Sequence, residues 1–267
     1  MAGSMLWFAA TALACVAAWQ AGTRLGRLNP PRAWLCVAGA TTMLLLWAWL
    51  SRNPAVAVEA IPVRVLSRIE GVAAVPLFLL ILGVAWARSG LTRQRAVVVA
   101  AVLVGVVHFV RGGGWMLQVT PAASFASTID RDMVMQSQDF SCVAAASATA
   151  LNRMGIYTSE AEMARLTRTT PGSGATIVRA MDGLAQRLAH TPWQPQLVQP
   201  TYDQLQTLPM PLLATVQSGP LQRHMIVVES ANDRHVWVVD PAGGRLLLDA
   251  GQFAQSFTGS VIVFVSR

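Results

Sequence analysis

The sequence predicts two parts: an α-helical membrane region of about four transmembrane helices, followed by a soluble α+β domain with an antiparallel sheet. Three observations support this division. Hydrophobic residues make up 54% of the 267 residues and charged residues only 12%, against about 25% charged in a typical soluble domain. Long apolar windows without charge occupy the N-terminal part of the chain. After them, helical patterns give way to short β-branched runs separated by turn residues.

Four apolar windows without Asp, Glu, Lys or Arg define the membrane region, residues 1–110; they are 5–21, 33–50, 71–87 and 96–110. A helix needs about 20 residues to cross a bilayer core, so the last window is long enough only with its flanking residues. Arg24 is the first basic residue, and it follows the first window. Because no positive residue precedes that window and further windows follow it, we expect a retained span and not a cleaved signal peptide.

Arginines in the short connections predict the orientation. The turns after the first and third windows lie on one side of the membrane and hold six arginines, whereas the other side holds four. The six are Arg24, Arg27, Arg32, Arg88, Arg93 and Arg95, and the four are Arg52, Arg64, Arg68 and Arg111. Since cytoplasmic loops are enriched in positive residues, we expect both termini and the soluble domain to lie outside the cytoplasm.

Charge and cysteine content exclude two classes of function. The net charge of +7 comes from the membrane region, which holds nine arginines and two glutamates; the rest of the chain holds eleven arginines and eleven acids. A nucleic-acid-binding face is therefore not expected, because the excess positive charge lies between apolar segments. The cysteines Cys15, Cys36 and Cys142 are too few and too scattered for a disulfide scaffold or a structural zinc site. Only Cys142 has polar surroundings.

A hinge over residues 111–131, rich in Gly, Pro and Ser, leads to the soluble domain, residues 132–267, which is long enough for one core. Helices are expected first and strands afterwards. The expected helices are 142–154, 159–167 and 176–189, and the expected strands are 211–216, 225–229, 236–239, 245–248 and 260–265.

Cys142 opens the first of these helices, where backbone N–H groups and the helix dipole favour a thiolate, the nucleophilic form of cysteine. A cysteine nucleophile also needs an imidazole to take its proton and a third group to orient that imidazole. His224 precedes one predicted strand and Asp240 follows the next, so neighbouring strands can present them side by side. Structural alternatives stay open: Cys142 as a small core residue, Asp240 as a turn residue before Pro241, and His235 as the base in place of His224.

Four polar positions, taken in order and with their spacing, resemble the pattern of a known family. Gln136 shortly precedes Cys142, His224 follows much later at the start of a predicted strand, and Asp240 comes at the end of the next strand. The pattern resembles the bacteriocin-processing peptidases, family thirty-nine of the cysteine peptidases, whose papain-like domains remove double-glycine leaders from exported peptides. The resemblance continues through residues 243–259 and covers the soluble half nearly end to end.

The resemblance implies a papain-like peptidase domain and a role for each polar position. Cys142 is the nucleophile, His224 the general base and then the general acid, and Asp240 the group that orients the imidazole. The side-chain amide of Gln136 and the backbone N–H of Cys142 stabilise the oxyanion, where the loss of one donor costs about 2.7 to 4 kcal/mol. Gln138 is the open alternative to Gln136.

The resemblance also implies partners and a location: a peptide or protein substrate cut after a small pair such as Gly-Gly, the bacterial inner membrane, and a separate export transporter. No cofactor and no metal site are expected. Two departures bear on leader specificity, because Ser141 replaces the usual acid before Cys142 and Val143 replaces the usual glycine after it. The sequence has no G-x-x-x-x-G-K-[ST] loop and no lysine, so it is not expected to power export. A catalytically idle leader-binding module and an acyl or amide transferase remain alternatives.

Overall fold

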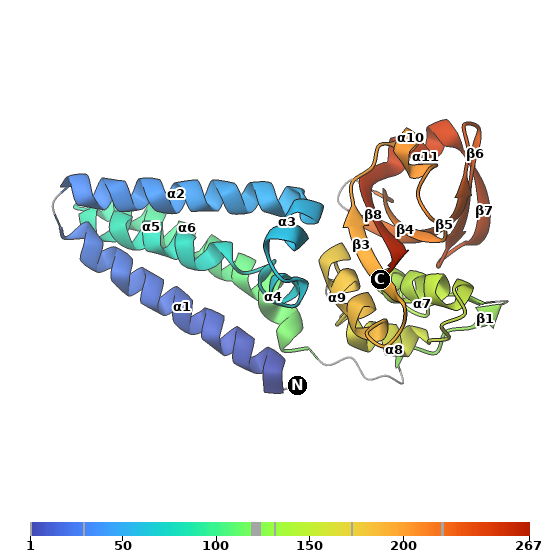
Figure 1. The fold of residues 1–267 in the computed structure, drawn as a ribbon. Coiled ribbons are helices and arrows are strands. Elements are labelled where there is room, and N and C mark those ends of the chain that lie inside the picture. The colour runs from blue at the N-terminus through green and yellow to red at the C-terminus, as the bar shows by residue number, and fades with distance from the viewer. Residues whose placement is uncertain (1, 29, 119–123, 131, 172, 220–221) are drawn as a thin grey trace. The chain divides into compact units, whose positions relative to one another are not determined.

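The computed structural model describes the chain except residues 1, 29, 119–123, 131, 172 and 220–221 (Figure 1). The chain divides into two compact units. The first comprises Met1–Asn53 and Arg68–Gln118, and the second comprises Pro54–Ser67 and Val119–Arg267. The second unit therefore includes a segment that precedes the third apolar window in the sequence.

Long apolar helices form the first unit. They are α1 (Ala2–Gly26), α2 (Pro30–Arg52), α5 (Ala74–Arg88) and α6 (Thr92–Gly113), followed by a short 3-10 helix, η1 (Gly114–Met116). Within the described residues, three spans are long and apolar enough to cross a membrane: those of α1 and α2, and one that continues from α6 through η1. A fourth exists if α4 (Val63–Ile69) and α5, bent by 50°, form one span. The apolar helical region predicted from the sequence is confirmed, with three or four candidate spans.

Glycines bring α1 and α5 together. A Cβ atom on Gly22 would collide with the carbonyl oxygen of Leu80, and one on Gly83 would lie 2.6 Å from that of Trp19. Such small residues permit the close backbone approach that is typical of membrane helix pairs. Many large apolar side chains of this unit face outward, among them Leu13 (70% exposed), Leu35 (73%) and Leu103 (60%). An apolar outer surface of this kind suits a lipid solvent.

The second unit is the α+β domain. Its helices are α3 (Pro54–Ala60), α7 (Cys142–Arg153), α8 (Glu160–Leu166), α9 (Ile177–Arg187), α10 (Tyr202–Leu205) and α11 (Ala250–Ser256). Its strands are β1 (Ile129–Asp130), β2 (Met133–Val134), β3 (Trp193–Val198), β4 (Leu212–Gln217), β5 (Arg223–Ala231), β6 (His235–Asp240), β7 (Gly244–Asp249) and β8 (Phe257–Ser266). Among the described residues, six strands form one antiparallel sheet in the order β3-β8-β4-β5-β6-β7.

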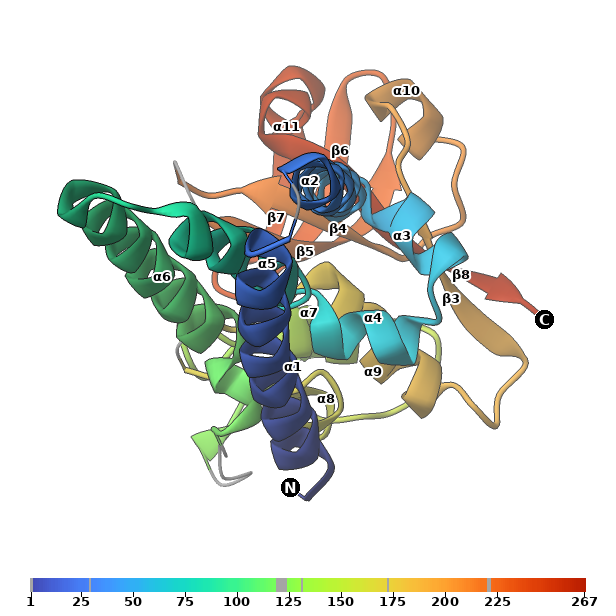
Figure 2. The ribbon, with the colours of Figure 1, turned by 90° about the vertical axis from the view of Figure 1, so that its left-hand side faces the viewer.

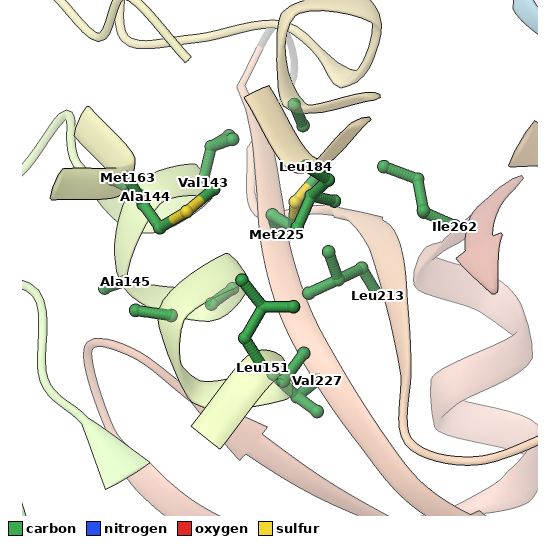
Figure 3. Packing of buried hydrophobic residues seen from close by; sticks show 14 of the residues in the cluster. Val143, Ala144, Ala145, Leu151, Met163, Leu184, Leu213, Met225, Val227 and Ile262 are labelled. Carbon is green, nitrogen blue, oxygen red and sulfur yellow. The ribbon is translucent and has the colours of Figure 1, made fainter. Parts of the chain in front are cut away.

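Apolar clusters cover both faces of this sheet. Helices α7 and α9 pack on one face, with α8 packed against these two helices, and α10 and α11 lie on the other face (Figures 1 and 2). On the first face, Leu151 of α7 and Leu184 of α9 meet Leu213, Met225 and Val227 of the strands (Figure 3). All five of these side chains are at most 2% exposed, so the helix that begins at the cysteine rests on a closed core.

The predicted antiparallel α+β fold is confirmed, but several of its elements were not predicted from the sequence: the short strands β1 and β2, the edge strand β3, and the helices α3, α10 and α11. Strand β3 pairs with β8 along its whole length, yet it carries Pro195, which weakened the strand pattern in the sequence. Proline is tolerated there because β3 is an edge strand. The segment 54–67 was also missed, because it looked like a loop between two spans. In the structure it forms α3 and most of α4.

Segment 54–67 belongs to the second unit through apolar and polar contacts. Ala55, Val58 and Val63 pack against the helix-side core cluster. The hydroxyl of Ser67, which is fully buried, donates a hydrogen bond to Asp182 Oδ2 at 2.9 Å. Arg168 donates to the same two groups, at 2.7 Å to the Ser67 hydroxyl and at 2.5 Å to Asp182. Segment 54–67 is therefore part of the same folded unit as the C-terminal half of the chain.

Candidate active site

Helix α7 places Cys142 at its first residue. Small residues from Ala144 to Ala150 are all buried, which lets the helix pack closely on β5 and β4. The chain leaves the helix through Gly155, whose φ of 75° lies in the left-handed region that glycine adopts readily. Ser141 occupies the N-cap position but makes no side-chain cap hydrogen bond. The Ser141 side chain therefore does not occupy the N–H groups of the first turn of α7, and these groups remain available beside Cys142.

Two neighbouring strands position His224 and Asp240. His224 is the second residue of β5, and Asp240 is the last residue of β6, which pairs antiparallel with β5. His224 Nε2 and Asp240 Oδ1 lie 2.7 Å apart. The turn into β7 fixes the carboxylate, because the same oxygen accepts the Ala242 N–H at 2.8 Å. Gly244, with φ 84°, closes this turn.

The Cys142 thiol meets His224 from the helical side. The two side chains share a hydrogen bond, and Cys142 also has backbone hydrogen bonds with Met225 and Val143. Because Nε2 of the imidazole faces Asp240, the other ring nitrogen, Nδ1, is the one left for the thiol. Three residues that are remote in the sequence thus form one continuous hydrogen-bonded series, from sulfur to imidazole to carboxylate.

The pKa values of these groups favour a thiolate–imidazolium pair. Burial acts to raise the pKa of Cys142, but the hydrogen bond and charge of His224, together with backbone hydrogen bonds from Met225 and Val143, outweigh it, and the pKa falls below its ordinary 9.0. For His224, burial acts to lower the pKa, but hydrogen bonds with Asp240 and Cys142 outweigh it and raise the pKa from 6.5 to about 9. The pKa of Asp240 is also lowered: burial opposes the shift, but the hydrogen bond and charge of His224, together with backbone hydrogen bonds from Ala242 and Gly243, outweigh it. Such a pair supplies both a nucleophile and a proton donor.

The loop before Cys142 carries the predicted oxyanion donor, Gln136. Its backbone N–H donates to the Pro241 carbonyl at 2.9 Å, which ties this residue to the turn that holds Asp240. Its side-chain Oε1 is shielded and has no hydrogen-bond partner among the described residues. Gln138 instead donates its amide N–H to the Ser124 carbonyl at 3.0 Å. The side chain of Gln138 is thus engaged elsewhere, and Gln136 remains the better candidate.

His235 lies apart from this cluster. It is the first residue of β6, whereas Asp240 is the last, and it is exposed. His235 pairs across the sheet with Asp249 and donates its backbone N–H to Asn232. The alternative of His235 as the base has no support in this geometry. Among the described residues, no group of three His, Cys, Asp or Glu side chains could hold a metal ion.

The sequence reasoning missed one residue of this site, Glu160 on α8. Its side chain is fully buried and contacts the loop that leads to Cys142. In the sequence, Glu160 follows Ser159 and precedes Glu162, so it looked like an ordinary acid in the first turn of a helix. Burial of one acid beside an exposed one leaves no sign in the helical pattern.

Comparisons with known proteins place this site within a matched region. A sequence model of the Peptidase C39 family matches residues 130–267. An uncharacterized protein of Methanothermobacter marburgensis is 35% identical over 138 residues, which is 50% of this chain and 88% of the relative. A second, from Methanothermobacter thermautotrophicus, is 34% identical with the same coverage.

Two solved structures are similar at lower identity. A double glycine motif protease from an AMS/PCAT transporter, in complex with the leader peptide, is 16% identical with a TM-score of 0.44, covering 56% of this chain and 100% of that one. The peptidase domain of Streptococcus ComA, a bi-functional ABC transporter, is 19% identical with a TM-score of 0.44, covering 50% and 96%.

Proposed function

We propose that this chain, which belongs to the peptidase C39 family, is a membrane-anchored cysteine endopeptidase that cuts a peptide bond in an exported or membrane-delivered peptide. One observation carries the proposal. The family match includes a cysteine at a helix N-terminus whose thiol is hydrogen-bonded to an imidazole, which in turn lies 2.7 Å from a carboxylate. Nucleophile, base and orienting group are the parts that covalent peptide hydrolysis needs.

In the first step, the thiolate of Cys142 attacks the scissile carbonyl carbon, and a C–S bond forms. The carbonyl oxygen takes the negative charge and is held by the Cys142 N–H and the Gln136 amide. His224 then passes its proton to the leaving nitrogen, so that the C–N bond breaks and an acyl-enzyme remains. Asp240 keeps the His224 imidazole oriented toward both the Cys142 sulfur and the leaving nitrogen.

In the second step, His224 takes a proton from water, and the resulting hydroxide attacks the acyl-enzyme. The C–S bond breaks, the new carboxyl group leaves, and the thiolate–imidazolium pair returns. An amine in place of water would give transfer instead of hydrolysis, because both routes share the acyl-enzyme. The product of the second step therefore distinguishes a peptidase from a transferase.

The substrate class follows from the family and the motif. We propose cleavage after a small-residue pair such as Gly-Gly, on the resemblance of the Gln136, Cys142, His224 and Asp240 pattern to that of double-glycine leader peptidases. Ser141 and Val143 flank the nucleophile and are both buried, so they shape the protein interior around the Cys142 thiol. An export transporter would act as a separate partner.

The apolar helices support anchoring in the bacterial inner membrane. Segment 54–67 and the C-terminal domain belong to one folded unit, so they lie on the same side of the bilayer. The chain between them must then cross an even number of times, which supports two crossings, one by α5 extended through residues 68–73 and one by α6, and four spans in all. The arginine distribution supports the outer side for this unit.

A cleavage assay tests the enzymatic proposal. The purified full chain in detergent is incubated with a peptide that carries a leader ending in Gly-Gly, and the products are identified by mass spectrometry. We expect two fragments from the native chain and none from Cys142→Ala. Binding of the peptide without cleavage by the native chain would favour the idle binding module, and an amine-capped product formed with added amine would favour a transferase.

Reagent access tests the orientation. A membrane-impermeant protease is applied to cells whose outer membrane alone has been permeabilised and to inverted vesicles, and cleavage beyond residue 130 is followed with a C-terminal tag. We expect cleavage in cells whose outer membrane has been permeabilised and protection in inverted vesicles. The opposite result would place the domain in the cytoplasm and would overturn the arginine-based orientation.

A further inference from the structure

Glu160 is an unusual residue for the core position that it occupies. Its side chain is fully buried, beside Met163 and Ala164, which are also buried, on the same helix. An apolar side chain would fill such a position without the desolvation that a carboxyl group requires. The carboxyl group makes its hydrogen bonds outside its own helix, to the loop of residues 137–141.

One oxygen of Glu160 holds both ends of that loop. Oε1 accepts the Ser137 backbone N–H at 2.9 Å and the Ser141 hydroxyl at 2.5 Å. Ser137 directly follows Gln136, and Ser141 directly precedes Cys142. The anchor therefore fixes the neighbours of both groups that stabilise the oxyanion in the proposed mechanism.

The anchor also explains the missing helix cap at Ser141. Serine at an N-cap position ordinarily accepts a hydrogen bond from a backbone N–H of the first turn. Here the Ser141 hydroxyl contacts Glu160 and the Gln138 backbone, and it caps nothing in α7. The N–H groups of the first turn of α7 are consequently left for the sulfur of Cys142 and for the developing oxyanion.

A second tie fixes the loop from the opposite side. The Gln136 backbone N–H donates to the carbonyl of Pro241, the residue after Asp240. Gln136 is thus held between the turn of the strands and the loop that Glu160 anchors. Rotation of this loop would change the position of Gln136 relative to Cys142, while the strand that carries His224 stays in place.

We propose that Glu160 is a positioning residue that brings the Gln136 amide and the Cys142 N–H to one point, where they bind the oxyanion. This inference rests on the proposed function, because it concerns the transition state of that reaction. Glu160 acts through the loop and not on the substrate. It should affect oxyanion binding and leave the reactivity of the thiol itself unchanged.

Two reagents separate these effects on the full chain in detergent. Iodoacetamide alkylates the Cys142 thiolate without forming an oxyanion, whereas a peptide aldehyde adds the S–H group across its carbonyl and places the resulting oxygen in the oxyanion site. For Glu160→Leu we expect affinity for the aldehyde and kcat for peptide cleavage to fall about 10²-fold. The alkylation rate of Cys142 should change less than about threefold, because His224 still sets its ionisation.

Three further variants keep the test decisive. Glu160→Gln retains an oxygen that accepts both hydrogen bonds, so kcat should fall less than about tenfold. Ser141→Ala changes only a small buried side chain and removes one of the two hydrogen bonds that Glu160 Oε1 accepts from the loop. This variant should lower kcat about tenfold, and it tests the inference even if Glu160→Leu fails to fold. Glu162→Gln is the matched control on the same helix, since Glu162 contacts Thr158 and Arg187 and not the loop.

A double-mutant cycle gives the last readout. If Glu160 acts through Gln136, then Glu160→Leu should lower kcat little further in a chain that already carries Gln136→Ala. Additive losses, or equal losses of alkylation and aldehyde affinity, would show a purely structural residue and overturn the inference. Normal alkylation without any peptide cleavage by the native chain would instead refute the proposed function.

Discussion

Backbone hydrogen bonds hold one side of this site, whereas side-chain hydrogen bonds hold the other. His224 and Asp240 sit in paired strands whose register fixes their separation. Gln136 and Cys142 lie around a loop whose shape depends on the Glu160 carboxylate and the Ser141 hydroxyl. The comparison teaches that the sheet holds the base, whereas the nucleophile loop depends on a few side chains and one backbone hydrogen bond, from Gln136 to Pro241. Mutations that touch no reacting group should therefore affect the loop side most.

The largest expected loss of kcat comes from removing the reacting group on either side of the site. Cys142→Ala and His224→Ala should each lower kcat for peptide cleavage by at least about 10⁴-fold, since neither side works alone. The double variant should be no worse than either single one. Labelling by a thiol-directed peptidase probe should disappear in Cys142→Ala while the protein remains folded and in the membrane. Equal labelling of this variant would remove the nucleophile assignment.

On the loop side, Gln136→Ala should lower kcat about 10² to 10³-fold, the usual loss for one oxyanion donor. Gln138→Ala is the matched control, because its amide binds the Ser124 carbonyl and not the site. We expect less than about a threefold change for this control, as for most surface substitutions. Steady-state kinetics on the full chain measure both, and a reversed order of the two losses would make Gln138 the donor.

On the strand side, pH reports the imidazole. Cleavage needs the Cys142 thiolate and the His224 proton together, so kcat/KM should rise through the lowered pKa of Cys142. It should fall as pH passes about 9, where His224 loses its proton. Asp240→Asn removes the carboxylate that helps to raise the His224 pKa, so the falling limb should move to lower pH. A falling limb that stays in place in this variant would contradict the role of Asp240.

The smallest expected effects on kcat come from substitutions in the two apolar clusters that cover the faces of the sheet. Phe253→Ala on the far face of the sheet should destabilise the domain by about 3 to 5 kcal/mol, and Met163→Ala on α8 by about 2 to 5 kcal/mol, because both side chains are fully buried. Below its lowered Tm, Phe253→Ala should keep the native kcat. Met163→Ala should lower kcat several-fold because α8 carries Glu160. Denaturant unfolding and kinetics on the same samples make the comparison.

Much of this arrangement was predictable from the sequence. The apolar windows, the helix at Cys142 and the strands around His224 and Asp240 follow from periodicity and turn residues. The spacing of polar residues singled out Cys142, His224 and Asp240, which the structure brings together. Their catalytic roles remain proposals that the variants above test.

Other features depend on tertiary contacts that no local pattern records. Strand β3 was missed because Pro195 lowers strand propensity, and only its edge position makes it acceptable. Segment 54–67 was missed as part of the domain because the partner of Ser67, Asp182, lies far along the chain. Glu160 was missed because a buried and an exposed acid look alike in the first turn of a helix.

The ionisation of Cys142 tests the central claim most directly. Alkylation of Cys142 by iodoacetamide is followed against pH by mass spectrometry of its peptide, in the native chain and in His224→Ala. We predict that the native thiol reacts well below pH 9.0 and that its reactivity changes again near pH 9, while the variant shows one transition at or above 9.0. A single transition at or above 9.0 in the native chain, unchanged in the variant, would contradict the account.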